Sequence, residues 1–133
     1  MTTELLKQYK GQKFTVIHCD GAIESFKEAL TSLGKSKSLS MTARMISQIN
    51  RLADGLPMSK DNFPQEGELP RRAGQPVKKF NALKRIPIRG YCWLSERHSR
   101  TYYISHYIYK NRDKLSESDT IKVGKNWRRI EEA

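Results

Sequence analysis

The sequence has few of the residues that cross-link or anchor small proteins, with two cysteines, three histidines and two tryptophans among 133 residues. Cys19 and Cys92 lie in apolar, strand-like runs, so we expect buried free thiols rather than a disulfide. The two cysteines and three scattered histidines do not have the spacing of zinc ligands, and no cofactor is expected. Disulfide-stabilised and zinc-finger classes are therefore excluded.

The chain also lacks any apolar run close to the ~20 residues that a membrane-spanning helix needs. Its first residues, MTTELLKQYKGQK, do not contain the apolar core of a signal peptide. We therefore expect a cytoplasmic protein with no membrane partner. A length of 133 residues with 37% hydrophobic residues predicts one domain, residues 1–133, with a modest core.

Acidic residues are scarce in the second half of the chain. Residues 71–133 contain 16 Lys and Arg against 6 Asp and Glu, whereas residues 1–70 contain 9 against 8. The formal net charge of +11 is therefore carried almost entirely by the second half. Such asymmetry indicates one functional surface for an acidic partner, which is a nucleic acid, an acidic protein or both.

Hydrophobic periodicity and turn residues predict an α+β fold. A small, mostly antiparallel sheet is expected to pack on an N-terminal helical hairpin, in the order β-α-α-β-β-β with a C-terminal helix. Asp20, Ser40 and Ser116 are the expected N-caps. Four of the five prolines fall in residues 56–76, which predicts a long loop. The expected elements are strand 13–19, helix 22–33, helix 41–54, strands 77–84, 86–95 and 101–110, and a last helix from 116 to 130.

The segment TYYISHYIYK at residues 101–110 is the strongest strand pattern in the chain. Strict alternation places Tyr102, Ile104, His106, Ile108 and Lys110 on one face, which we expect to pack on the helices. The alternate residues Tyr103, Ser105, Tyr107 and Tyr109 then form a partly open tyrosine face. Exposed aromatic rings beside cations suit the stacking of nucleic-acid bases.

The order of the expected elements and the residues of the second half resemble those of the RelE/HigB/ParE superfamily, the toxins of type II toxin–antitoxin systems. The resemblance is to HigB-like members in particular. The similar segments are FNALK at 80–84, a strand beginning at Arg89-Gly90-Tyr91, and YYISHYIYKNRDK at 102–114. The resemblance implies a RelE-like fold and a ribosome-dependent, metal-independent endonuclease that cuts mRNA. It also implies mRNA, the ribosome and an acidic antitoxin as partners. The chain departs from the HigB-like pattern in three ways. Its loop at 56–76 is longer, and one arginine, Arg89, has to serve for the second arginine that such chains place in a Y-R strand motif. The segment K-N-R-D-K stands where they have a plain Lys-Lys pair.

Cleavage of RNA at its 2′-hydroxyl needs a proton acceptor, cations around the phosphate and a proton donor for the leaving oxygen. His106 suits either proton-transfer role, because imidazole titrates near neutral pH; the alternative is a hydrogen-bonded core histidine. Arg89 is the expected phosphate clamp, with a strand-edge salt bridge as the alternative. The catalytic candidates are Arg89, His106, Tyr109, Lys110 and Arg112.

The remaining cations and aromatics of the second half are candidates for binding nucleic acid, or else ordinary solvated or packed side chains. His18, Trp93 and Trp127 are expected to be structural. The nucleic-acid-binding candidates are Lys78, Lys79, Lys84, Arg85, Arg97, His98, Arg100, Tyr107 and Lys114.

Two other functions are consistent with the same residues. One is a non-catalytic protein of the same fold that binds a host protein, as ParE-like members bind DNA gyrase. The other is a basic nucleic-acid-binding module with no turnover. The first alternative predicts that His106 is dispensable, and the second predicts binding that weakens strongly with salt.

Overall fold

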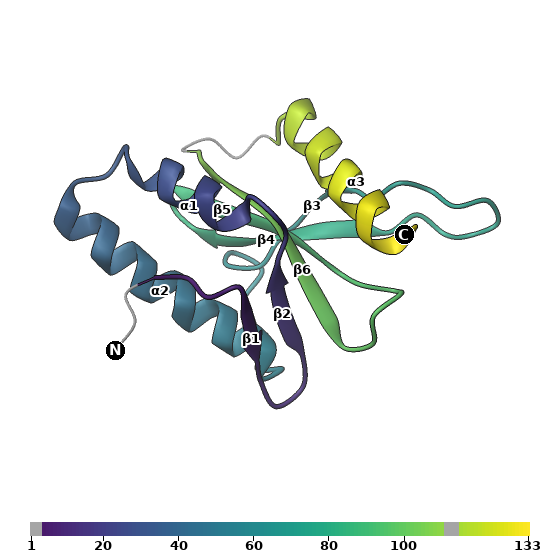
Figure 1. Ribbon diagram of the computed structural model, residues 1–133, viewed down its shortest axis with the longest axis horizontal. Helices are drawn as coiled ribbons and strands as arrows, with labels where there is room; N and C mark the ends of the chain where they lie inside the picture. Colours follow the sequence, from purple (N-terminus) through teal and green to yellow (C-terminus); the bar gives the residue numbers. More distant parts are fainter. Residues whose placement is uncertain (1–3, 111–114) are drawn as a thin grey trace.

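The computed structural model describes residues 4–110 and 115–133, which form three helices and one six-stranded mixed sheet (Figure 1). The strand order across the sheet is β1-β2-β6-β5-β4-β3. The helices are α1 (Ala22–Leu30), α2 (Lys35–Ala53) and α3 (Glu117–Glu131); the strands are β1 (Gln8–Lys10), β2 (Thr15–His18), β3 (Gln65–Glu68), β4 (Lys79–Arg85), β5 (Ile88–Leu94) and β6 (Thr101–Tyr109).

The expected α+β class is confirmed, and four of the five strand pairs are antiparallel. The exception is central, because β2 pairs with β6 in parallel, with Thr15 opposite Thr101 and His18 opposite Ile104. Two short strands were not expected: β1 precedes the predicted first strand, and β3 lies inside the region 56–76 that the sequence predicts as a loop. A parallel pair needs a long crossover, and here α1 and α2 lie within it.

Helix α1 begins at Ala22 as predicted but without its predicted cap, whereas α2 begins six residues earlier than predicted. Helix α1 begins after Gly21, whose φ of 86° favours glycine, and Asp20 bonds Lys7 at 3.2 Å instead of capping the helix. Helix α2 begins at Lys35, so Ser40 lies inside the helix, and residues 35–38 form its first turn. The prediction for α3 is confirmed, since the hydroxyl oxygen of Ser116 accepts a hydrogen bond from the Asp119 N–H.

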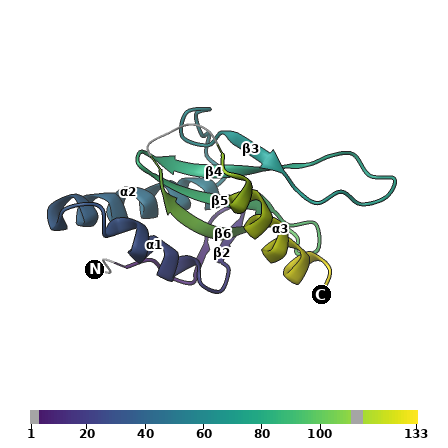
Figure 2. The ribbon, with the colours of Figure 1, turned by 90° about the horizontal axis from the view of Figure 1, so that it is seen from above.

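The sheet lies between two helical layers. Helices α1 and α2 cover one face, where Phe26, Met45 and Ile49 pack against Leu83 and Ile104. Helix α3 covers the opposite face (Figure 2). Each fully buried large apolar side chain contributes about 1.5–3 kcal/mol, so these two cores hold α1, α2 and α3 against the sheet.

A β-bulge in β6 overturns the predicted face alternation. Tyr91 pairs with His106 and Cys92 pairs with Ile104, so Ser105 has no residue opposite it on β5. Residues before the bulge keep the expected alternation, but every residue after it faces the other way. His106 therefore lies on the α3 side rather than under the helical hairpin.

The predicted open tyrosine face does not exist. Tyr103 is buried under α3, where its ring stacks on Trp93 at 5.6 Å. Tyr107 is buried under α1, in edge contact with Phe26 at 4.9 Å. Its ring lies over Gly90, where an added Cβ would come within 2.5 Å of it. Of the four alternate residues, only Tyr109 remains exposed, at 42%.

The C-terminal end of α3 is fixed by one buried carboxylate. Glu131 accepts hydrogen bonds from the Trp93 indole N–H at 3.2 Å, the Ser95 hydroxyl at 2.7 Å, and the backbone N–H groups of Glu96 and Arg97 at 2.9 Å each. Burial alone would raise the pKa of Glu131, but these hydrogen bonds outweigh it and lower the pKa below its usual value. Glu131 thus joins α3 to the β5–β6 connection.

A second buried polar pair lies under α1. The His18 Nδ1 is 2.8 Å from the Leu6 carbonyl oxygen, which can only accept, so Nδ1 carries the proton. The Tyr107 hydroxyl, 2.7 Å from Nε2, then donates to the neutral ring. Burial lowers the pKa of His18 to about 4, and it raises that of Tyr107 well above its usual value. Both groups are therefore neutral at pH 7.

Replacing Glu131 with Gln should lower the free energy of unfolding by about 2–3 kcal/mol, because an amide cannot accept all four hydrogen bonds and loses the charge that strengthens them. Urea denaturation at pH 7 measures this. Glu132→Gln is the matched control, since Glu132 is the exposed neighbour and should change stability by less than about 0.5 kcal/mol. Equal effects of the two substitutions would contradict this assignment.

Stability should fall on acidification through His18. Its pKa is about 4 in the folded chain and near 6.5 when unfolded, so between these values the unfolded state binds the extra proton. From pH 7.5 to pH 5 the wild type should lose about 2 kcal/mol more than His18→Gln. Urea titrations at both pH values test this, with the exposed His98→Gln as control. Parallel pH profiles for the wild type and His18→Gln would rule out this assignment.

Candidate functional site

Six polar residues form a cluster on the α3 side of the sheet, where β5 begins and β6 ends. We call it the buried polar cluster. Arg89 and Tyr91 come from alternate positions of β5, and His106 lies opposite Tyr91 on β6. Its members are Glu66, Arg89, Tyr91, His106, Lys110 and Asp119.

Arg89 is enclosed by protein. It is 2% exposed, and its guanidinium lies 3.5 Å from the Glu66 carboxylate on β3. Glu66 stands at a register shift between Gln65 and Gly67, which turns its side chain toward β5. Lys84 lies directly opposite Arg89 on β4, so two cations share this end of the sheet.

His106 is the centre of a hydrogen-bonded relay. The Asn126 amide of α3 donates to the Ser105 hydroxyl oxygen at 2.8 Å, and Ser105 lies 2.8 Å from the His106 Nδ1. The His106 Nε2 lies 2.9 Å from the Asp119 carboxylate. The Ser105 hydroxyl can donate to neutral His106 or accept from its charged form, so the relay accommodates both protonation states.

The relay contains serine, histidine and aspartate, yet Ser105 is poorly placed as a nucleophile. It is 1% exposed, and its hydroxyl oxygen already accepts a hydrogen bond from Asn126. A nucleophile must reach an incoming substrate. Ser105 therefore orients the His106 ring instead.

Asp119 occupies the first turn of α3, where the helix dipole favours a negative charge. The Ser116 hydroxyl donates to one carboxylate oxygen at 2.7 Å, and His106 bonds the other. Burial alone would raise the pKa of Asp119, but these two hydrogen bonds and the charges of His106 and Lys110 outweigh it and lower the pKa. Asp119 is thus a carboxylate at neutral pH.

Two buried hydrogen-bond donors of the cluster, the Tyr91 O–H and the Lys110 ammonium, have no acceptor among the residues that the structure describes. The Arg89 guanidinium interacts with the Tyr91 oxygen and lowers its pKa, but less than burial raises it. Burial raises the pKa of Tyr91, and the negative charges of Asp119 and Glu66 raise it further. The phenol therefore keeps its proton at neutral pH. An unsatisfied buried donor costs about 1–3 kcal/mol, so an acceptor that reached these two donors would remove that cost.

The structure brings together three of the five residues that the sequence nominates for catalysis: Arg89, His106 and Lys110. Tyr109 follows Tyr107 onto the opposite face, because the bulge reverses both. Arg112 and Lys114 lie outside the described residues. Tyr107, nominated for nucleic-acid contact, is in the core.

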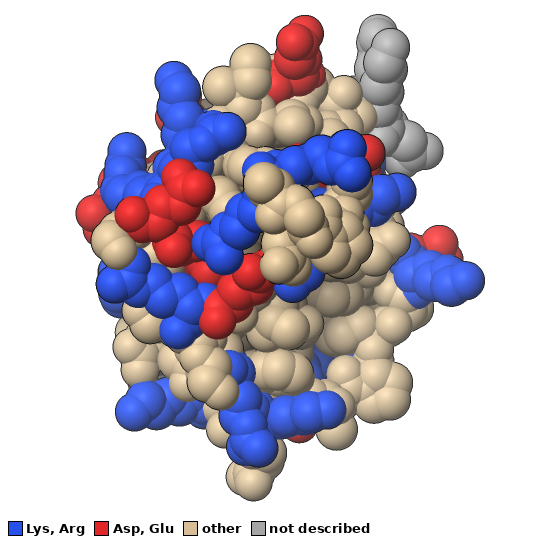
Figure 3. Space-filling model, turned by 90° about the vertical axis from the view of Figure 1, so that its right-hand side faces the viewer, with Lys and Arg blue, Asp and Glu red and all other residues tan. Residues whose placement is uncertain are grey.

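The nucleic-acid-binding candidates divide between the two ends of the sheet. Lys84 and Arg85 lie at the end that carries the buried polar cluster, with Arg85 beside Arg44 on the α2 side. Figure 3 shows the other end, where lysine and arginine side chains spread over the surface with carboxylates among them. The exposed candidates at that end are Lys78, Lys79, Arg97, His98 and Arg100.

Some of these distal side chains make specific contacts although they remain exposed. Lys78 and Arg72 pair with Glu96 at 2.6 and 3.2 Å, and Arg72 lies over the Trp127 ring at 4.9 Å. His98 shares a hydrogen bond of 2.8 Å with the Tyr103 hydroxyl. The expectation that Trp93 and Trp127 are core residues is confirmed.

The sequence analysis did not identify three of the six members of the buried polar cluster, which are Glu66, Tyr91 and Asp119. Tyr91 could have been found, because it alternates with Arg89 in a strand. Asp119 had a signal in the Ser116-x-x-Asp119 capping pattern, which places a carboxylate on the first turn. Glu66 had none, since its strand lies in a proline-rich region.

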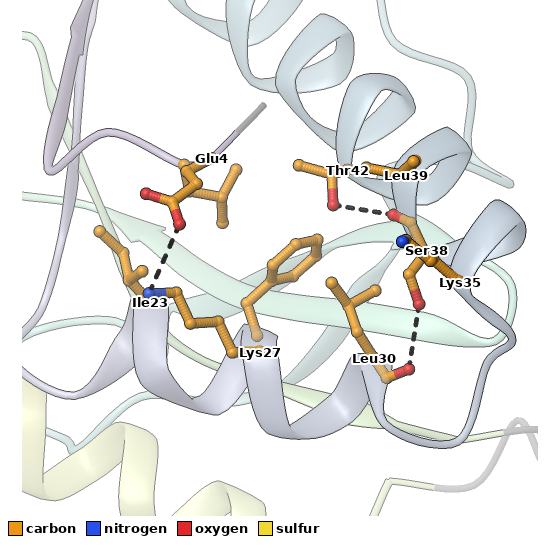
Figure 4. A pocket seen from close by; sticks show the side chains of 10 residues that line it. Glu4, Ile23, Lys27, Leu30, Lys35, Ser38, Leu39 and Thr42 are labelled. Atoms are coloured by element: carbon orange, nitrogen blue, oxygen red, sulfur yellow. Dashed lines mark hydrogen bonds and ion pairs between the residues drawn. The ribbon is translucent and has the colours of Figure 1, made fainter. Parts of the chain in front are cut away.

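A separate groove of about 490 Å³ lies between α1 and α2 (Figure 4). Its floor is apolar, with Ile23, Phe26 and Leu30 from α1. Lys27 and Lys35 lie on its rim, and Lys27 pairs with Glu4 at 4.0 Å. The groove offers packing surface rather than reacting groups.

Across the described ranges 4–110 and 115–133, no helix has the length and apolarity needed to cross a membrane. The same residues contain no group of three or more His, Cys, Asp or Glu side chains placed to hold a metal ion. Comparisons of the chain with protein-family models, with curated proteins and with solved structures found no match.

Proposed function

We propose that this chain is a RelE-like toxin of a toxin–antitoxin system that cuts mRNA on the ribosome without a metal ion. The element order supports this proposal, since β2-α1-α2-β4-β5-β6-α3 is the order that the resemblance implies once the short strands β1 and β3 are set aside. The basic second half supports nucleic acid as the partner.

One observation carries the proposal: the buried Tyr91 and Lys110 donors, which have no acceptor among the described residues, lie in one cluster with Arg89 and the His106–Asp119 pair. A phosphodiester supplies the acceptors that these donors lack. Arg89 and Lys110 would hold its oxygens and stabilise the charge that grows in the transition state. Tyr91, held neutral by its raised pKa, would donate a third hydrogen bond.

The chemistry is an attack of the ribose 2′-oxygen on the phosphorus. The O2′–P bond forms and the P–O5′ bond breaks, which leaves a 2′,3′-cyclic phosphate and a 5′-hydroxyl. When substrate replaces Asp119 at the His106 Nε2, Ser105 accepts from Nδ1–H, and Nε2 is free to take the 2′-hydroxyl proton. Lys110 or Tyr91 supplies the proton of the leaving oxygen.

Entry to the cluster requires a rearrangement, because Arg89 and His106 are each 2% exposed. The carboxylates of Glu66 and Asp119 cover these two residues, and both carboxylate side chains reach solvent. A substrate phosphate would replace one carboxylate at the cations, so one anion is exchanged for another. This exchange avoids leaving a buried cation unpaired.

The proposal includes an acidic antitoxin as partner. An amphipathic acidic segment fits the groove between α1 and α2, with apolar side chains on Ile23, Phe26 and Leu30 and carboxylates near Lys27 and Lys35.

The closed cluster also favours the non-catalytic alternative, a protein of this fold that binds a host protein such as gyrase. In that case Arg89 with Glu66, and His106 with Asp119, are structural ion pairs. Variants that separate stability from activity distinguish the two functions.

Tyr91→Phe and Lys110→Met should each leave the free energy of unfolding unchanged or raise it by up to about 1 kcal/mol, because each removes a buried group that has no partner. Both should lower mRNA cleavage by about 100-fold, since each removes a contact to the transition state. The readouts are urea denaturation and primer extension on a reporter mRNA after induction in a bacterial host.

Tyr102→Phe and Lys37→Met are the matched controls. Tyr102 lies on the face of β6 that packs on α1 and α2, and Lys37 is exposed on α2. Both should retain cleavage. Folded Tyr91→Phe and Lys110→Met variants that cut like the wild type would sink the proposal, and growth arrest without any cuts would favour the host-protein alternative.

A further inference from the structure

A polar hollow opens beside the buried polar cluster, along an edge of β6 that no other strand of the described residues covers. Strand β2 ends at His18, opposite Ile104, and the last hydrogen bond from the β2 segment to that edge joins the Cys19 N–H to the Ile104 carbonyl oxygen at 2.9 Å. Farther along, β6 runs between α1 and α3 (Figure 2). The hollow at this edge has a volume of about 440 Å³. Its lining includes Glu28, Thr31, Ser32, Tyr109, Asp119 and Lys122.

The hollow reaches the site proposed above, because His106 and Asp119 belong to its lining as well as to the buried polar cluster. A ligand in the hollow therefore touches the carboxylate that covers His106. Pockets of 300–1,000 Å³ hold small ligands, so the hollow is large enough for a single nucleoside.

The lining can hold a nucleobase by stacking and by hydrogen bonds. The Tyr109 side chain is 42% exposed and offers a ring for stacking. The Tyr107 N–H points to this edge, where it donates to the Ser25 hydroxyl oxygen at 2.9 Å. Because Tyr109 lies two residues farther along the strand, its backbone N–H and C=O point the same way.

The charge of Glu28 makes the hollow selective. A carboxylate accepts a hydrogen bond from an exocyclic amino group, which cytosine, adenine and guanine carry. Uracil presents a carbonyl oxygen at the position of the cytosine amino group, and a carboxylate repels it. Glu28 and Lys122 thus offer one acceptor and one cation on opposite helices.

An extended peptide fits this edge less well than a nucleoside. Strand addition draws its affinity from a ladder of main-chain hydrogen bonds. Here the Tyr107 N–H is already bonded to Ser25, so Tyr109 is the remaining described residue of β6 that could pair on this side.

We propose that the hollow between α1, the β6 edge and α3 binds the nucleoside next to the scissile phosphate and prefers a base with an exocyclic amino group. This inference rests on the proposed function for the identity of the phosphate. The binding of a nucleotide and its base preference can be measured without any cleavage.

The test is a titration of the ¹⁵N-labelled full chain with cytidine 3′-monophosphate and, separately, uridine 3′-monophosphate. The amide signals of Thr31, Ser32, Tyr109 and Lys122 should shift with the cytidine nucleotide at about tenfold lower concentration than with the uridine nucleotide. Glu28→Gln should abolish this difference, because a side-chain amide can donate to the uracil oxygen as well as accept. Glu24→Gln, exposed one turn earlier on α1, is the matched control and should keep it.

Ser32→Trp, which fills the hollow from its rim, should abolish the shifts of both nucleotides. Nucleotide shifts confined to the distal cations Lys78, Arg97 and Arg100 would overturn the inference. The same holds if inorganic phosphate reproduces the shifts, or if an extended peptide causes them and the nucleotides do not.

The two proposals fail separately. Base-selective binding in the hollow without mRNA cleavage upholds this inference and removes the nuclease. Cleavage that Ser32→Trp leaves unchanged in rate and in base preference upholds the nuclease and removes this inference.

Discussion

The arrangement of polar groups in this protein depends on one extra residue in β6. Ser105 has no residue opposite it on β5, and the pleat of the strand is therefore reversed from that point onward. Without the bulge, His106 would point into the apolar layer under α1 and α2, and Tyr107 would meet α3. With it, His106 reaches Asp119 while Tyr107 reaches His18. A backbone irregularity of one residue thus places His106 on the α3 face and brings Tyr107 to His18 on the other face.

The packing of the sheet on the helical hairpin could be predicted from the sequence because it follows from hydrophobic periodicity, whereas the face that α3 covers was expected to be partly open. The apolar stripes of α1 and α2 and the alternation in β4 to β6 are local patterns, and the Ser116 cap is a local hydrogen bond. The bulge could not be predicted, since any residue can be left unpaired and the partner strand determines which one is. The parallel pairing of β2 and β6 joins residues more than 80 positions apart, and no local pattern encodes it.

The difference between local patterns and long-range contacts also explains which residues of the candidate site could be predicted. Arg89, His106 and Lys110 were found because each has the chemistry of a phosphate site and a place in a strand. Tyr91 shares the face of Arg89 by alternation, but its value as a hydrogen-bond donor follows only from its burial and its lack of an acceptor. Glu66 and Asp119 belong to the site only because they pair with Arg89 and His106 in the folded chain. Residue types therefore predict part of the cluster, and tertiary structure determines the rest.

The parallel pair of β2 and β6 also governs when this protein can form during synthesis. Residues 15–18 take their place in the sheet only after residues 101–104 arrive, so most of the chain must leave the ribosome before the central strands join. Until then β2 and β5 both carry open edges, and His18 has no Tyr107 to bond. Contacts of such long sequence separation slow folding and leave partly made chains exposed to aggregation. A chain whose synthesis has stopped before β6 therefore lacks both the His18–Tyr107 pair and the His106–Asp119 pair. The buried polar cluster forms only once β6 and α3 have been made.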